Sequence, residues 1–201
     1  MITVVLIDDH PLAVNGIGEW LRSTGRFAIA GTAGSLAQAQ ALFENLEILP
    51  SVVILDIALG PEDGLEVIPM LKTIAKKRKT ALPGIVVCSM FEDPFLIQNA
   101  RNAGAGAYVA KSADINEVTS AIDAVLAGNT YIRAEYQLPV QKWASSGLSR
   151  REREIVALIK QRLNNKEIAE KMYISIRTVE NHLSHIYVKT NTNSRNELSE
   201  L

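Results

Sequence analysis

The chain has 201 residues, 47% of them hydrophobic, and carries 21 Lys and Arg against 22 Asp and Glu. This composition excludes a disordered chain, because the apolar side chains can bury a core and the net charge is only −1. The length suits one large domain or two modest ones.

Cysteine content and the first residues indicate the compartment. Cys88 is the only cysteine, so the chain forms no internal disulfide. No basic stretch followed by an apolar core of about 7 to 15 residues opens the sequence, and nothing approaches the roughly 18 consecutive apolar residues that span a bilayer. We therefore expect a cytoplasmic protein without membrane contact.

Charge is distributed unevenly along the chain. Residues 1–127 hold 9 Lys and Arg against 14 Asp and Glu, whereas residues 147–201 hold 10 against 7. An acidic front and a basic tail indicate two domains with different partners.

Five apolar runs alternate with stretches of helical periodicity in the first 127 residues. The runs predict strands at 3–7, 27–33, 51–56, 84–89 and 106–110. The stretches between and after them predict helices at 12–22, 35–48, 64–76, 94–103 and 114–127. Because the strands are apolar throughout, we expect a parallel sheet covered by helices on both faces, in a doubly wound α/β arrangement.

Reactive side chains follow four of these strands. Asp8 and Asp9 follow the first, Asp56 ends the third, Ser89 ends the fourth and Lys111 follows the fifth. Ligands of open α/β sheets bind beyond the carboxyl ends of the strands, so these groups should meet at one edge. A single carboxylate at a strand end is usually only solvated, but four strand ends with this chemistry indicate a site.

Three carboxylates a few ångströms apart require a positive charge among them. Each pair repels by about 1 kcal/mol even at the dielectric constant of water. Mg²⁺ is commonly held by one or two carboxylates with a phosphate oxygen and water, and an aspartate beside such an ion can attack phosphorus. Lys111 and the Ser89 hydroxyl would then hold the phosphoryl oxygens.

These residues lie in motifs that resemble the receiver domain of bacterial two-component signalling. The resemblance covers residues 1 to about 127, through IDDH, VVILDIALGPEDGLEVI, VCSMFED and GAGAYVAKS. It implies a flavodoxin-like (βα)5 sheet with strand order 2-1-3-4-5.

The resemblance also implies a role for each acid. Asp56 would accept a phosphoryl group from a sensor histidine kinase. Asp9, Asp56 and the Ala58 carbonyl would ligate Mg²⁺, while Asp8 would act mainly through water.

Two further residues would form the family's switch. The Ser89 hydroxyl would move toward the phosphate and the Tyr108 ring would turn inward, although Tyr108 alone reads as an ordinary aromatic at a strand end. The sequence departs from the family at Gly60, where proline is usual and where Pro61 instead follows, but Gly64 matches the pattern.

Residues 128–147 are predicted to form a linker. The sequence GNTYIRAEYQLPVQKWASSG contains turn formers and few periodic apolar positions. Its aromatic residues Tyr131, Tyr136 and Trp143 could pack on either neighbouring domain.

Three helices are predicted after Leu148. Ser149 and Glu152 form a capping box ahead of the first, and a short second helix spans roughly 165–172. Ser175 caps a third of about 15 residues, roughly 22 Å long. On this third helix the expected buried face is Ile176, Val179, Leu183 and Ile186, and the expected outer face is Arg177, Glu180, Asn181, Ser184 and Val188.

The polar outer face suits the DNA major groove, although charge alone fits a plain helical bundle equally well. LSRREREIVALI, NNKEIAEKMYIS and RTVENHLSHIYVKT resemble the LuxR-type helix-turn-helix across nearly all of residues 148–195. With a receiver in front, this is the architecture of NarL/FixJ-type response regulators, with domains at 1–127 and 148–201. Candidate base contacts are Glu180, Asn181 and Ser184, and candidate phosphate contacts are Lys166, Thr178, His182 and Lys189.

Positions 180 and 162, and the KTN at 189–191 where KLG is usual, depart from the LuxR-type pattern. The family often has lysine where Glu180 stands and glycine where Arg162 stands. A carboxylate at position 180 can accept a hydrogen bond from cytosine N4, so the preferred DNA sequence should differ from that of relatives.

The favoured hypothesis is a transcription factor controlled by phosphorylation of Asp56, which binds double-stranded DNA as a homodimer when phosphorylated. It would not be an enzyme beyond promoting its own phosphorylation and dephosphorylation. A regulator controlled by partner binding alone is one alternative. A phosphohydrolase with Asp56 as nucleophile is another, although no segment supplies the substrate cap that such an enzyme usually has.

Overall fold

The computed structural model describes residues 1–60, 62–90, 94–133, 148–190, 192 and 194–200. Within these residues the chain divides into two compact units, one built on a parallel sheet and one on the C-terminal helices. Residues 134–147 of the predicted linker, with Tyr136 and Trp143, lie outside the described part. No helix in the described ranges combines the length and apolar character needed to cross a bilayer.

The first unit contains the predicted five-stranded parallel sheet. Its strands are β1 (Ile2–Ile7), β2 (Phe27–Ala33), β3 (Val52–Leu55), β6 (Gly84–Ser89) and β7 (Ala107–Ala110). Their order is β2-β1-β3-β6-β7 and all neighbours are parallel. This confirms the doubly wound arrangement, because numbering the five strands in chain order gives 2-1-3-4-5.

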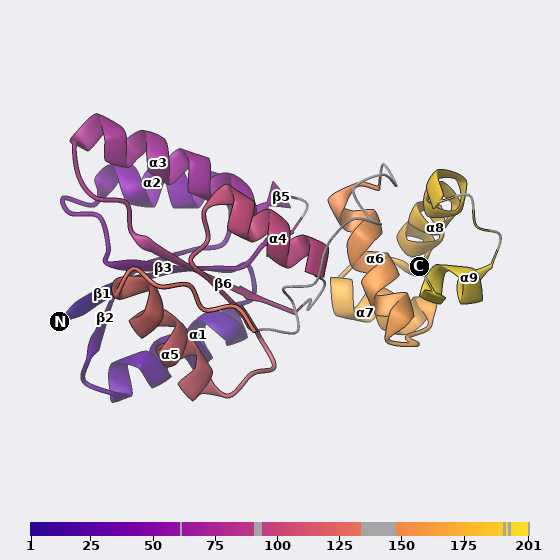
Figure 1. Cartoon of the computed structure of the whole chain (residues 1–201), viewed down its shortest axis with the longest axis horizontal. Coiled ribbons are helices and arrows are strands. Elements are labelled where there is room, and N and C mark those ends of the chain that lie inside the picture. Colours follow the sequence, from indigo (N-terminus) through magenta and orange to yellow (C-terminus); the bar gives the residue numbers. More distant parts are fainter. Residues whose placement is uncertain (61, 91–93, 134–147, 191, 193, 201) are drawn as a thin grey trace. The chain divides into compact units, whose positions relative to one another are not determined.

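Helices cover both faces of this sheet. Figure 1 shows α1 and α5 on one face and α2, α3 and α4 on the other. Each helix follows a strand as predicted, although α3 is preceded by a 3₁₀ turn at Gly64–Glu66. The helices are α1 (Pro11–Ser23), α2 (Leu36–Asn45), α3 (Val67–Arg78), α4 (Pro94–Ala103) and α5 (Ile115–Leu126).

A small second sheet was not predicted. The two-residue strands β4 (Ala58–Leu59) and β5 (Glu62–Asp63) pair antiparallel directly after β3. This hairpin fixes the chain that follows Asp56 next to the carboxyl end of β3.

The sheet is buried on both sides, which explains its continuous apolar strands. Every residue of β3 is at most 3% exposed, and Val4 and Val86 are fully buried in a cluster that includes Leu21 of α1 and Ile122 of α5. Burial of each such side chain contributes about 1.5 to 3 kcal/mol. The sheet is therefore a rigid base that fixes where each strand ends.

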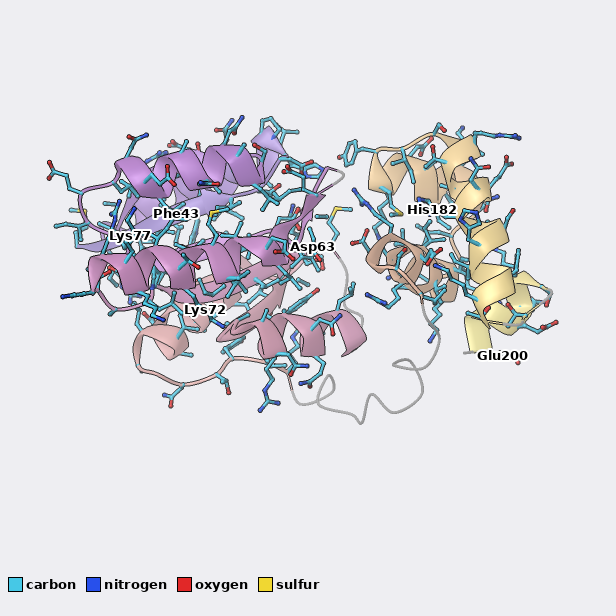
Figure 2. The ribbon with its side chains drawn as sticks, turned by 90° about the horizontal axis from the view of Figure 1, so that it is seen from above. Phe43, Asp63, Lys72, Lys77, His182 and Glu200 are labelled. Atoms are coloured by element: carbon cyan, nitrogen blue, oxygen red, sulfur yellow. The ribbon has the colours of Figure 1, made fainter. Side chains whose placement is uncertain are left out.

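Basic side chains tie the helices of the other face together. The Arg78 guanidinium donates to the carbonyls of Phe43, Glu44 and Leu46 at the end of α2. Lys72 donates through Nζ to the Ala103 carbonyl at the end of α4, at 2.6 Å. Figure 2 shows Phe43 between α2 and α3 and Lys72 between α3 and α4. These cations satisfy carbonyls that a helix end leaves without partners.

In the described residues from 148 onward, the second unit contains four helices. They are α6 (Arg150–Lys160), α7 (Asn165–Met172), α8 (Ile176–Thr190) and α9 (Arg195–Glu200). The predicted capping box of Ser149 and Glu152 is present, and Asn164 and Glu167 form another on α7. The Ser175 Oγ accepts the Thr178 N–H at 3.0 Å, as expected for the cap of α8.

The predicted inner face of α8 is correct from its second turn onward. Val179, Leu183 and Ile186 are buried, and α8 packs against α6 and α7. Ile176 was also expected to be buried and is 45% exposed, so that prediction is wrong. Ile176 is the first residue of the helix, and the buried face begins three residues later, at Val179.

Candidate functional site

Backbone hydrogen bonds beyond the strand ends position the predicted site residues. The Asp8 N–H donates to the Ala33 carbonyl at 2.9 Å, and the Asp56 N–H donates to the Ile7 carbonyl at 2.7 Å. The Lys111 N–H donates to the Ser89 carbonyl, also at 2.7 Å. The hydrogen bonding of the sheet thus extends to the residues that carry the acids and the lysine.

The structure brings Asp8, Asp56 and Lys111 into direct contact. The Lys111 Nζ lies 2.6 Å from Asp8 Oδ2 and 2.7 Å from Asp56 Oδ2. The side chains of Lys111, Asp8 and Asp56 are 12%, 9% and 2% exposed, in that order. Charge-assisted hydrogen bonds of this length in a nearly dry site hold the three groups firmly.

Burial shifts the titration of this group. It raises the pKa of Asp56, an effect that the Lys111 ammonium only partly offsets and the Asp8 charge reinforces. Burial alone would lower the pKa of Lys111, but the neighbouring carboxylates outweigh it and raise that pKa. Lys111 therefore stays an ammonium facing the two acids.

Asp9 is held by two other groups, Gly60 and His10. The Gly60 N–H donates to its Oδ2 at 2.8 Å, and the His10 Nδ1 lies 2.8 Å from its Oδ1. The same His10 nitrogen lies 3.1 Å from Asp8 Oδ1, an oxygen that also accepts the His10 N–H at 2.9 Å. Sequence reasoning missed both His10 and Gly60, although the adjacency of His10 to the acid pair was a usable signal.

Gly64 has no room for a side chain. A Cβ at this position would lie 2.0 Å from the Asp56 carbonyl oxygen and 2.9 Å from the Ile57 Cα. Both are backbone atoms that cannot swing away. The glycine expected here lets the backbone of residue 64 lie against the backbone of the buried Asp56.

The donor set fits a divalent cation of the Mg²⁺ class. One potential ligand atom from each of Asp8, Asp9, His10 and Asp56 lies within 4.8 Å of the others. Three carboxylates facing one ammonium leave excess negative charge, and hard carboxylate oxygens are the ligands that Mg²⁺ prefers. The acidic cluster therefore matches the predicted metal site in its chemistry.

The predicted switch residues and Cys88 are buried in the neighbouring strands β6 and β7. Ser89 is fully buried and pairs with Ala110, and Tyr108 is 2% exposed and pairs with Val87. Burial raises the pKa of the Cys88 thiol to about 12, so the thiol stays protonated.

An open cleft leads to the acids. It runs between the start of α1 and the end of β2 with the residues that follow it. Its lining consists of Asp8, Asp9, Pro11, Val14, Asn15, Thr32, Ala33, Gly34 and Gln38.

The second unit exposes the predicted base-contact residues on α8. Glu180, Asn181 and Ser184 are exposed and His182 is partly buried, while the Ser184 hydroxyl donates to the Glu180 carbonyl at 3.1 Å. His185, which was not a candidate, is exposed on the same helix. The Val188 side chain, also expected on the outer face, lies outside the described part.

The other three predicted phosphate contacts, Lys166, Thr178 and Lys189, differ in their surroundings. Lys166 on α7 has a side chain that is 75% exposed. The Thr178 hydroxyl lies 2.8 Å from that of Ser175 at the start of α8. Lys189, in contrast, donates through Nζ to both Glu152 oxygens at 3.0 and 2.8 Å, so its ammonium is engaged in holding α8 to α6.

A buried aspartate paired with lysine at the carboxyl edge of a five-stranded parallel sheet, followed by a helix-turn-helix unit, defines a receiver joined to a DNA-binding domain. Family profiles agree, because that of the response regulator receiver domain matches residues 4–123 and that of the luxR family of bacterial regulatory proteins matches residues 146–201. The chain belongs to the response regulators of this two-domain type. Within that family it is a phosphorylation-controlled, DNA-binding transcriptional regulator of a two-component system.

Relatives match over nearly the whole chain. The transcriptional regulatory protein MctR of Rhizobium johnstonii is 33% identical over 192 residues, covering 94% of this chain and 86% of its own. The oxygen regulatory protein NreC of Staphylococcus epidermidis and the transcriptional regulatory protein LiaR of Bacillus subtilis are each 30% identical, covering 98% of this chain and 94% of theirs.

Solved structures share the fold. The response regulator ChrA of a heme-sensing two-component system is 28% identical with a TM-score of 0.51, covering 99% of this chain and 94% of its own. RcsB of Salmonella typhimurium is 22% identical with a TM-score of 0.56, covering 99% and 96%, and supports the fold alone.

Proposed function

We propose that Asp56 is the phosphoryl acceptor and that a sensor histidine kinase is the donor. The supporting observation is the contact of Lys111 Nζ with Asp56 Oδ2 at 2.7 Å in a site where Asp56 is 2% exposed. A carboxylate oxygen of Asp56 attacks phosphorus, the P–N bond to the kinase imidazole breaks, and the released nitrogen keeps the bonding electrons. The lysine beside the acceptor oxygen neutralises charge that develops on the phosphoryl group.

Mg²⁺ is the proposed cofactor. Asp9 and Asp56 would hold it with the Ala58 carbonyl, and Asp8 would act through water. When bound, the ion supplies positive charge to the phosphoryl oxygens. Lys111 and the Ser89 hydroxyl would hold the other oxygens of the phosphorylated state, with Tyr108 responding to the Ser89 position.

The output is a change in DNA binding. Phosphorylation adds roughly 1.5 to 2 negative charges at Asp56, enough to shift an equilibrium between two conformations. Phosphorylated chains would pair as homodimers and read two half-sites about one helical turn apart. Residues 1–127 would form the receiver and 148–201 the DNA-binding domain, acting in the cytoplasm. Base contacts would come from Glu180, Asn181 and Ser184, and phosphate contacts from Lys166, Thr178, His182 and Lys189.

The test compares wild-type protein with Asp56→Asn. DNA sites are first selected from random sequence with the phosphorylated wild type, and affinity for them is then measured with and without acetyl phosphate. We expect the wild type to gain mass from one phosphoryl group and to bind at least tenfold more tightly, and Asp56→Asn to show neither change. Asp114→Asn is the matched control, because Asp114 caps α5 and asparagine caps equally well.

The outcomes separate the alternatives. An Asp56→Asn protein that still responds to the donor would contradict the assignment of Asp56. Donor-independent DNA binding with no labelling of the wild type would favour control by a partner. Steady turnover of a small phosphate ester would favour a phosphohydrolase.

A further inference from the structure

The chain does not leave the sheet where α5 ends. Residues 129–133, here called the edge segment, follow Gly128, which has a left-handed φ of +76° and turns the backbone. The Tyr131 N–H donates to the Gly106 carbonyl at 2.9 Å, and the Tyr108 N–H donates to the Tyr131 carbonyl at 3.0 Å. These bonds form a parallel bridge between Tyr131 and Ala107 on the outer edge of β7.

Side chains reinforce this pairing. Tyr131 packs against the same buried cluster that contains Ala107 and Ile122. Arg133 forms a bidentate ion pair with Glu117 of α5, with Nε 3.0 Å from Oε1 and Nη2 2.7 Å from Oε2. Glu117 is only 14% exposed, which makes this pair better shielded than an ordinary surface pair.

The edge segment is bonded to the strand that carries the proposed switch. Its Tyr131 carbonyl accepts the N–H of Tyr108 itself, and β7 continues from there toward Lys111, which contacts Asp56. A movement of Tyr108 or β7 therefore acts directly on the backbone of residue 131. In sequence, the edge segment is also the start of the connection to the DNA-binding unit.

We propose that the edge segment couples the state of Asp56 to the DNA-binding unit, with the Arg133–Glu117 pair holding it on β7. The inference rests on the proposed phosphorylation of Asp56. Phosphorylation changes the stability of the Tyr131 pairing, and the changed pairing alters the start of the connection. Any coupling of this kind requires that the segment respond to the phosphoryl group by a measurable free-energy difference.

The primary test is hydrogen exchange of the full-length wild-type chain, followed on peptides covering 106–110 and 129–133. We expect the amides of Tyr108 and Tyr131 to exchange at a rate that changes at least threefold when mass analysis shows Asp56 to be phosphorylated. Unchanged exchange in fully phosphorylated protein overturns the inference. Absence of the phosphoryl group in the wild type instead counts against the proposed function, so the two failures are distinguishable.

Variants then test transmission. Arg133→Gln should speed exchange of these amides about two- to fivefold, and Tyr131→Pro, which removes the N–H donor as well, by about tenfold or more. Both should be phosphorylated to the wild-type extent but lose most of the gain in DNA affinity. The matched control is Arg26→Gln. It breaks an exposed 2.5 Å ion pair with Asp123, which lies on α5 as Glu117 does, and it should keep the full gain in DNA affinity on phosphorylation. The proposal is contradicted if Tyr131→Pro keeps the full gain in DNA affinity on phosphorylation, or if Arg133→Gln is no longer phosphorylated.

Discussion

Gly60 shows how one residue can replace a feature usual in the family. Proline is common at this position, but proline lacks an N–H and has φ near −65°. Gly60 has φ +54° and donates its N–H to Asp9 at 2.8 Å. The departure therefore creates a hydrogen bond that proline could not make, and it holds the acid that we propose as a metal ligand.

Gly64 gives the first prediction at the residue scale. Gly64→Ala places a Cβ 2.0 Å from the Asp56 carbonyl oxygen, so the backbone of the acceptor must move. We expect the free energy of unfolding to fall by about 2 to 4 kcal/mol and labelling of Asp56 by acetyl phosphate to fall at least tenfold. Urea unfolding and intact mass measure the two effects.

Gly16→Ala is the control for that substitution. Gly16 lies within α1 and a Cβ there meets nothing within 4 Å, so alanine should stabilise the helix by about 0.5 to 1 kcal/mol. If Gly64→Ala behaved like Gly16→Ala, the steric account of the loop would be wrong.

At the scale of elements, Glu152 joins two helices of the DNA-binding unit. Its carboxylate accepts the Ser149 N–H of the α6 cap at 2.6 Å and both bonds from Lys189 of α8. Burial acts to raise the pKa of Glu152, but the hydrogen bonds from Lys189 and Ser149 outweigh it and hold that pKa below its ordinary value of 4.5. A carboxyl group with a lowered pKa stabilises the folded state when ionised.

The sign of this linkage predicts a pH dependence. Stability from Glu152 is fully present above the ordinary value of 4.5 and is lost as the pH falls through the lower pKa of the folded state. Glu152→Gln should lower the unfolding temperature of this unit at pH 7 and flatten its dependence on pH below 4.5. Thermal unfolding of both proteins between about pH 3 and 7 checks this. An equally steep acid transition in the variant would rule out Glu152 as its source.

Two lysines of the same unit should affect DNA binding differently. Lys166 is 75% exposed, whereas Lys189 is paired with Glu152. We expect Lys166→Gln to weaken binding to all DNA sequences and to reduce the salt dependence by about one ion, with unfolding unchanged. Lys189→Gln should in addition lower the unfolding temperature, because it breaks the ion pair with Glu152. Binding isotherms at several salt concentrations distinguish them, and a normal unfolding temperature for Lys189→Gln would contradict the structural role of its ion pair.

At the scale of the whole molecule, the sequence predicted the elements whose signal is repeated over many residues. The strand Val52–Leu55 is buried on both faces, so its apolar run was unambiguous, and the capping box at Ser149 identified the start of α6. The β4–β5 hairpin was missed because strands of two residues have no periodicity to detect. The pairing of Tyr131 was also invisible, since it depends on backbone bonds to a strand more than twenty residues away in the sequence.

The candidate site was likewise predictable only where a strand end positions the residue. Strand-end positions were sufficient to group Asp8, Asp56 and Lys111, because the sheet order determines which ends are neighbours. The contacts of His10 and Gly60 with Asp9 depend on loop conformation, which no periodic pattern encodes. The engagement of Lys189 by Glu152 likewise requires knowing how α8 lies on α6.

The buried thiol of Cys88 gives the molecule a built-in reporter. The side chain is 3% exposed and its pKa is about 12, so a water-soluble disulfide reagent can reach a reactive thiolate only when the sheet opens. Modification by such a reagent should therefore report how often the sheet opens, and acetyl phosphate should change its rate in the wild type but not in Asp56→Asn. Because Cys88 is the one cysteine of the chain, its modification rate measures how phosphorylation alters the local stability of the receiver, without an engineered probe.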